Sequence, residues 1–153
     1  MTTGWRRGCG LAVCVIALAG CERQPNPRNE IAAIAEAALT EVQRTAPGQA
    51  LCVDRTIAPW QTAADAHRHD PPAPPGYDAL YGDGVFRGGG GLKEASVGGV
   101  AVRGGSGCLD LRGPLVSGDQ AMIEVHQAAT GLNLWLQRTG GDWRVVMTTT
   151  STY

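Results

Sequence analysis

Lysine is almost absent from this chain of 153 residues, because Lys93 is the only one. The 13 basic side chains are therefore nearly all arginines, and with 14 acidic side chains the formal net charge is −1. Proteins that bind nucleic acid need clustered Lys and Arg on one surface. A mildly acidic chain lacks that electrostatic footprint, so we expect no nucleic-acid partner.

The motifs of several enzyme classes are missing as well. The four glycines at 88–91 are not followed by Gly-Lys-Ser/Thr, and no strand and helix flank them as in a phosphate-binding or dinucleotide-binding loop. Gly105, Ser106 and Gly107 do not match the Gly-x-Ser-x-Gly motif of a nucleophilic serine. We therefore expect no cofactor and no enzymatic activity.

No apolar run is long enough to cross a bilayer. The longest follows Arg6 and Arg7 and covers residues 11–19, whereas a membrane-spanning helix needs about 20 apolar residues. A basic segment, a short apolar segment and small residues after it are the parts of a secretory signal. The N-terminus therefore predicts export from the cytoplasm.

The end of that segment resembles the lipobox of bacterial lipoproteins, through Leu18, Ala19, Gly20 and Cys21. The resemblance implies a signal peptide at 1–20, cleaved before Cys21, and fatty acyl chains such as palmitate on Cys21. Residues 21–28, with two prolines, are then a short lipidated tether. The alternative is a plain secreted protein with a cysteine at its cleavage site by chance.

The resemblance also implies a location in the bacterial cell envelope. Glu22 after the cysteine favours the outer membrane, with the domain in the periplasm. Gly8, Cys9 and Gly10 follow the arginine pair where a twin-arginine signal has apolar residues, which favours general secretion. Cleavage would remove two arginines and no acid, so the net charge would change from −1 to −3. The expected partners are the membrane, through the lipid anchor, and an envelope protein.

The cysteines fit an oxidising compartment. Cys9 and Cys14 belong to the signal peptide and Cys21 carries lipid, so Cys52 and Cys108 remain as one pair. We expect a disulfide between them. The alternative, a metal-binding or catalytic thiol, requires nearby His or Cys, and none stands within several residues of either cysteine.

One amphipathic helix is predicted near the start of the mature chain. Its apolar stripe follows the spacing i, i+3, i+4, i+7, i+8 and i+11, with these members: Ile31, Ile34, Ala35, Ala38, Leu39 and Val42. Asn26 or Asn29 can cap its start, and Pro47 with Gly48 ends it.

Strands are predicted at 50–57, 97–102, 108–112, 121–128, 132–138 and 143–150. Tight turns are expected at Gly140-Gly141-Asp142 and at Thr130-Gly131, and residues 59–91, rich in Pro and Gly, are expected to be an irregular loop. The pattern predicts a single α+β domain at 29–153, in which the helix packs on an antiparallel β-meander of four to five strands.

Alternation assigns the apolar residues to faces. Ile123 and Val125 share one face, and Leu132, Leu134 and Leu136 share one. On the last strand, Trp143, Val145 and Met147 are expected together. The helix stripe is predicted to cover the face that carries Ile123, Val125, Leu134 and Val145.

The last 40 or so residues resemble small secreted bacterial proteins with a cystatin-like or NTF2-like arrangement of a helix and a curved sheet. The matching segments begin at Ala121 (Ala-Met-Ile-Glu-Val), Leu136 (Leu-Gln-Arg), Gly140 (Gly-Gly-Asp) and Trp143 (Trp-Arg-Val-Val). Those proteins often carry cysteines before the last hairpin, where this chain has Gly131-Leu-Asn. The resemblance implies a fold and no activity.

Three groups of residues are candidates for chemistry. His67 and His69, with Asp65 and Asp70 nearby, have the residue types of a transition-metal site, although adventitious surface histidines are the simpler interpretation. Glu124 and His126 share a strand face and could form a general base, although two solvated side chains are the ordinary outcome. Trp135 marks either a binding surface or a contact under the 59–91 loop.

Two hypotheses follow. The first is a non-catalytic envelope protein that binds a partner at the membrane surface. The second is a small enzyme or metal-binding protein that uses His67, His69 or His126. Convergence of those histidines with a carboxylate would favour the second hypothesis.

Overall fold

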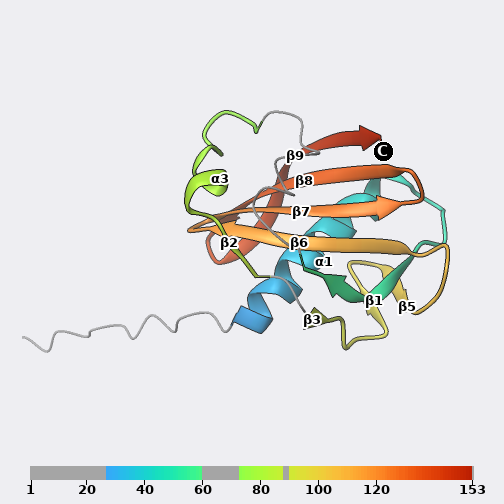
Figure 1. Cartoon of the computed structure of the whole chain (residues 1–153). Helices are drawn as coiled ribbons and strands as arrows, with labels where there is room; N and C mark the ends of the chain where they lie inside the picture. Colours follow the sequence, from blue (N-terminus) through green and yellow to red (C-terminus); the bar gives the residue numbers. More distant parts are fainter. Residues whose placement is uncertain (1–26, 60–72, 88–89, 153) are drawn as a thin grey trace, which may run out of the picture.

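A computed structural model describes residues 27–59, 73–87 and 90–152 (Figure 1). The expected signal peptide, Cys21, His67 and His69 lie outside these residues. Helix α1 (Pro27–Thr45) contains the predicted apolar stripe and begins with a proline, whose missing N–H is tolerated in a first helical turn.

The described strands form one curled sheet that α1 crosses on one face (Figure 1). Seven strands follow the order β4-β5-β1-β6-β7-β8-β9, and the two-residue strands β2 and β3 pair with β6 and β1. Their bounds are β1 (Cys52–Ala58), β2 (Val85–Phe86), β3 (Gly90–Gly91), β4 (Ser96–Val97), β5 (Val100–Arg103), β6 (Leu109–Ser117), β7 (Gln120–Gln127), β8 (Thr130–Thr139) and β9 (Asp142–Thr152).

The sheet is larger than the predicted four to five strands and is mixed. The antiparallel meander is present in β6 to β9, but β1 runs parallel to both β5 and β6. The segment predicted as one strand at 97–102 is a hairpin of β4 and β5, because Gly98 and Gly99 both adopt positive φ angles. Thr130 and Gly131 pair within β8 and are not a turn, whereas Gly140 and Gly141 form the predicted tight turn.

Gly98 allows the β4–β5 hairpin to approach α1 closely. A Cβ atom at this position would lie 2.6 Å from the Thr40 backbone nitrogen and 2.7 Å from the Glu36 carbonyl oxygen. Real Cβ atoms essentially never come that close to other atoms. The turn therefore needs glycine both for its φ of 57° and for its contact with the helix.

The main core lies between α1 and the sheet. Ile34, Ala38 and Val42 join Ile123, Val125 and Leu134 in one buried cluster, with Ile31 and Val145 packed at its margin. The predicted contact between helix stripe and sheet is confirmed. Neither surface would be stable in water alone.

A bulge at Val146 reverses the face of the second half of β9. Leu136 pairs with Val145, but Trp135 pairs with Met147, so Val146 is an extra residue and is 55% exposed. Trp143 and Val145 lie on the helix side, whereas Met147 packs in a second cluster on the opposite face. The prediction that Met147 shares their face was wrong.

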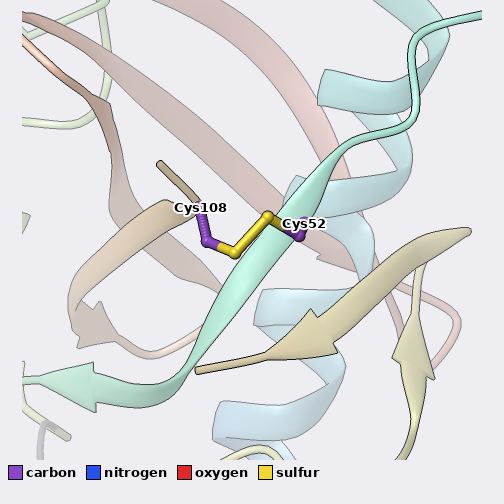
Figure 2. Close-up of a disulfide and its surroundings, with 2 residues drawn as sticks. All are labelled: Cys52 and Cys108. Carbon is purple, nitrogen blue, oxygen red and sulfur yellow. A yellow bond between two sulfur atoms is a disulfide. The ribbon is translucent and has the colours of Figure 1, made fainter. Parts of the chain in front are cut away.

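The predicted disulfide joins Cys52, the first residue of β1, to Cys108, directly before β6 (Figure 2). It closes a loop with a sequence separation of 56 residues. Part of that loop is regular: α3 (Ala79–Asp83), β2 and β3 all lie within 59–91. The expectation of an irregular segment throughout 59–91 was therefore wrong for these residues.

Candidate functional site

A line of polar side chains crosses four strands on the sheet face opposite α1. Arg112 pairs with Glu124, Glu124 with Asn133, and Asn133 with Thr149. Residues that pair directly across antiparallel strands project to the same side, with Cβ atoms about 4.5–5.5 Å apart. We call these four residues the polar row: Arg112, Glu124, Asn133 and Thr149.

The middle of the polar row is buried. Glu124 and Asn133 are each 1% exposed, Thr149 is half-buried and Arg112 is exposed. The ordinary outcome for Glu124 and His126, two solvated side chains, was therefore wrong. A carboxylate at this depth has a large desolvation penalty unless charge or hydrogen bonds compensate it.

His126 is the closest charge partner of Glu124. Its Nε2 atom lies 2.7 Å from Glu124 Oε1, and the imidazole is also buried. The two atoms are within ion-pair distance, but their angles are not those of a hydrogen bond. The two residues are separated by two positions on β7, so the same strand face brings them together.

Several buried polar atoms of the row have no hydrogen-bond partner. Within the part of the chain that the structure describes, these are both carboxylate oxygens of Glu124, both side-chain polar atoms of Asn133, and Thr149 Oγ1. The large majority of buried side-chain polar atoms in folded proteins are hydrogen-bonded. The five atoms of the row lie together on one sheet face, so this part of the core is polar and closed to solvent.

Aromatic residues occupy the neighbouring part of the same face. Trp135 is fully buried, with ring centroids 5.7 Å from Tyr77 and 6.0 Å from Tyr81 in edge-to-face geometry. The Tyr77 hydroxyl donates to Gln137 Oε1 at 3.4 Å, and burial raises the pKa of Tyr77. Of the two interpretations of Trp135, the contact under the 59–91 segment is confirmed, since Tyr77 and Tyr81 come from that segment.

The described residues contain no metal site. No group of three or more His, Cys, Asp or Glu in this part of the chain could hold a metal ion. His67, His69, Asp65 and Asp70 lie outside it. The structure thus brings one of the three candidate histidines, His126, to a carboxylate.

A second charged cluster joins the first turn of α1 to β8. Arg138 Nη1 lies 3.2 Å from the buried Glu30 Oε1, and Arg87 Nε lies 3.9 Å from Glu30 Oε2. The Arg138 guanidinium also binds Asp119 Oδ1 at 2.8 Å and lies 5.2 Å from the ring centroid of Trp143. These contacts hold the helix on the sheet and leave few polar groups of the cluster for a ligand.

Two open grooves flank α1. One, of about 510 Å³, lies between α1 and the start of β9, beside Thr40, Asp142 and Arg144. The other, of about 630 Å³, lies beside the first turns of α1, next to Ile31, Leu92 and Lys93. Both have mixed linings, and neither contains the polar row.

Sequence reasoning missed Asn133 and Thr149. The two-residue turn at Gly140-Gly141 fixes the register of β8 and β9, and without a bulge it would place Asn133 opposite Thr148. The extra residue Val146 moves the pairing by one position to Thr149. Asn133 could have been found from the sequence. Once the turn between β7 and β8 is known, the strand register places Asn133, a polar residue, opposite Glu124.

Comparison with protein-family models, curated proteins and solved structures gives no match. No helix among the described residues is long and apolar enough to cross a membrane.

Proposed function

We propose that the protein is a lipid-anchored protein of the bacterial cell envelope whose domain is a non-catalytic binding module. The observation that carries the anchor is the series Leu18-Ala19-Gly20-Cys21 after a basic and apolar segment. The disulfide Cys52–Cys108 supports an oxidising compartment, such as the periplasm.

The distance from the anchor to the domain is short in sequence. Cys21 precedes Pro27, the first residue of α1, by six positions. A fully extended chain of that length spans about 20 Å. Lipidation of Cys21 would therefore keep the domain close to the bilayer, where a membrane-associated partner is accessible, and Glu22 favours the outer membrane.

The binding role is supported by the polar row. Buried polar side chains without hydrogen-bond partners are uncommon in folded proteins, and packing alone does not explain them here. Enzymatic use of the same face is the second candidate, favoured by the 2.7 Å contact between Glu124 and His126. His67 and His69 remain candidates for that second function.

Replacement of Cys21 by serine tests the anchor. The parent should fractionate with membranes and incorporate labelled fatty acid, and Cys21→Ser should do neither. Crosslinking in intact cells tests the binding role: a partner protein captured with the parent and lost with Glu124→Gln supports it. A Cys21→Ser protein that stays labelled and membrane-bound rules out lipidation at this residue.

A further inference from the structure

Strand β9 is the longest of the described strands and forms one border of the sheet (Figure 1). It pairs with β8 on one side, and no described strand pairs with its other side. Alternate residues of an edge strand point their backbone N–H and C=O groups away from the sheet. Among the described residues, the outer side of β9 therefore offers a row of donors and acceptors to a further strand.

Natural proteins protect sheet edges with short strands, charged side chains, prolines or bulges. The opposite border of the sheet follows this rule, because β4 has only two residues. The first half of β9 is protected as well, by Asp142, Arg144 and the bulge at Val146. The second half, residues 147–152, has no charge, no proline and no bulge. It is the one long unprotected edge among the described strands.

Helix α1 leaves room for an additional strand beside this half of β9. Thr148 pairs with Leu134, and Thr150 pairs with Leu132. Both leucines belong to the core cluster under α1, so the two threonines project to the helix side of the sheet. Both threonines are exposed, which shows that α1 does not extend over them.

The surroundings of this edge favour a second copy of the chain over a foreign peptide. Proteins that bind peptides by strand addition use backbone hydrogen bonds for affinity and pockets beside the strand for selectivity. The groove of about 510 Å³ lies beside the first half of β9, and neither described groove includes a residue of 147–152. A second copy needs no such pocket, because an edge is its own complement about a two-fold axis.

The side chains of 147–152 are compatible with antiparallel pairing of the segment with itself. With the two-fold axis at Thr149, Thr148 of one copy lies opposite Thr150 of the partner subunit. Threonine pairs across antiparallel strands are favourable, and no like charges would face each other. Asp142 and Arg144 lie before the bulge at Val146, where the change of face ends the pairing.

We propose that the protein forms a two-fold dimer in which residues 147–152 of β9 pair antiparallel with the same residues of a second copy, about Thr149. The two sheets join into one continuous sheet. The dimer goes beyond the binding module proposed above and does not depend on lipidation of Cys21.

Native mass spectrometry of the mature protein, released from mild detergent, counts the copies in each particle. We expect dimers from the parent. Thr148→Lys combined with Thr150→Lys should weaken the dimer by about tenfold or more, because two pairs of like charges would lie directly opposite each other. Both positions are exposed, so this variant should melt like the parent.

A reversed charge tests the register. Thr148→Lys combined with Thr150→Asp places opposite charges across the axis at Thr149, and this variant should dimerise at least as well as the parent. Ser96→Lys is the matched control, because it adds a lysine at an exposed position on β4, the other border of the sheet. It should leave the dimer unchanged.

A monomeric parent would overturn the proposal, and so would a double-lysine variant that dimerises like the parent. A particle with one copy and a different protein would assign the edge to a foreign strand and overturn it too. Failure of the lysine–aspartate variant to dimerise would contradict pairing about Thr149. The same spectra give the mass of each chain, so missing acyl chains on Cys21 are detected separately from the number of copies.

Discussion

Arg138 Nη1 lies 3.2 Å from Glu30 Oε1, and this contact joins β8 to the first turn of α1. Glu30 is buried, and Arg138 also binds Asp119 and packs over Trp143. One arginine thus links the helix, the β6–β7 turn and the last hairpin. No helix or strand pattern in the sequence predicts this contact, because it joins residues 108 positions apart.

Arg138→Gln should lower the free energy of unfolding by about 1–3 kcal/mol. Among the described residues it leaves the buried Glu30 with the more distant Arg87 as its one remaining ion-pair partner. Arg144→Gln, an exposed arginine on β9, is the control and should change stability by no more than about 0.5 kcal/mol. Denaturant unfolding measures both. Equal stabilities for the two variants would contradict a structural role for the Arg138–Glu30 contact.

Ile34→Asp should unfold the domain, because Ile34 is fully buried between α1 and the sheet and an unpaired charge there has no compensation. Ala33→Asp, one position earlier and exposed, is the matched control and should remain folded. Circular dichroism during heating distinguishes them. If Ile34→Asp melts like the parent, α1 does not cover the sheet.

The helix and the meander were predictable because their signals are local. The 3.6-residue period of Ile34, Ala38 and Val42 and the tight turn at Gly140-Gly141 both survive in the structure. The parallel pairing of β1 was not predictable, since it joins segments about 50 residues apart and depends on the whole sheet. The burial of Glu124 was not predictable for the same reason. The alternation of side chains along a strand determines the face on which Glu124 lies, but it does not determine which segments cover that face.

Bulges and glycine turns account for the other errors. One extra residue, Val146, moves Met147 to the opposite face and determines that Thr149 lies opposite Asn133. No composition signal marks that residue. Gly98 and Gly99 form the turn that divides a predicted strand into the β4–β5 hairpin. Two adjacent glycines are typical of such a turn, so this hairpin could have been predicted from the sequence.

Gly98→Ala should destabilise the domain by several kcal/mol, because its methyl group would collide with the backbone of α1 at Glu36 and Thr40. It would also force alanine into a positive φ. The control is Gly104→Ala, since a Cβ at Gly104 would have nothing within 4 Å. Thermal unfolding of the two variants gives the comparison, and a Gly98→Ala protein as stable as the control would place the β4–β5 turn away from the helix.

Loss of the disulfide should lower stability by about 2–5 kcal/mol, because the bond closes a long loop and ties β1 to β6. The variant is Cys52→Ser with Cys108→Ser, so that no free thiol remains. Thiol titration of the parent after unfolding, without reductant, checks the bond itself. Two reactive thiols from Cys52 and Cys108 would show that the bridge does not form in the cell.

The most direct test of the account is the mass of the N-terminal peptide of the mature protein isolated from its native cells. The mature chain is expected to begin at Cys21, with fatty acyl chains on the sulfur and on the new amino terminus. A mature chain that begins at another residue, or an unmodified Cys21, would contradict it.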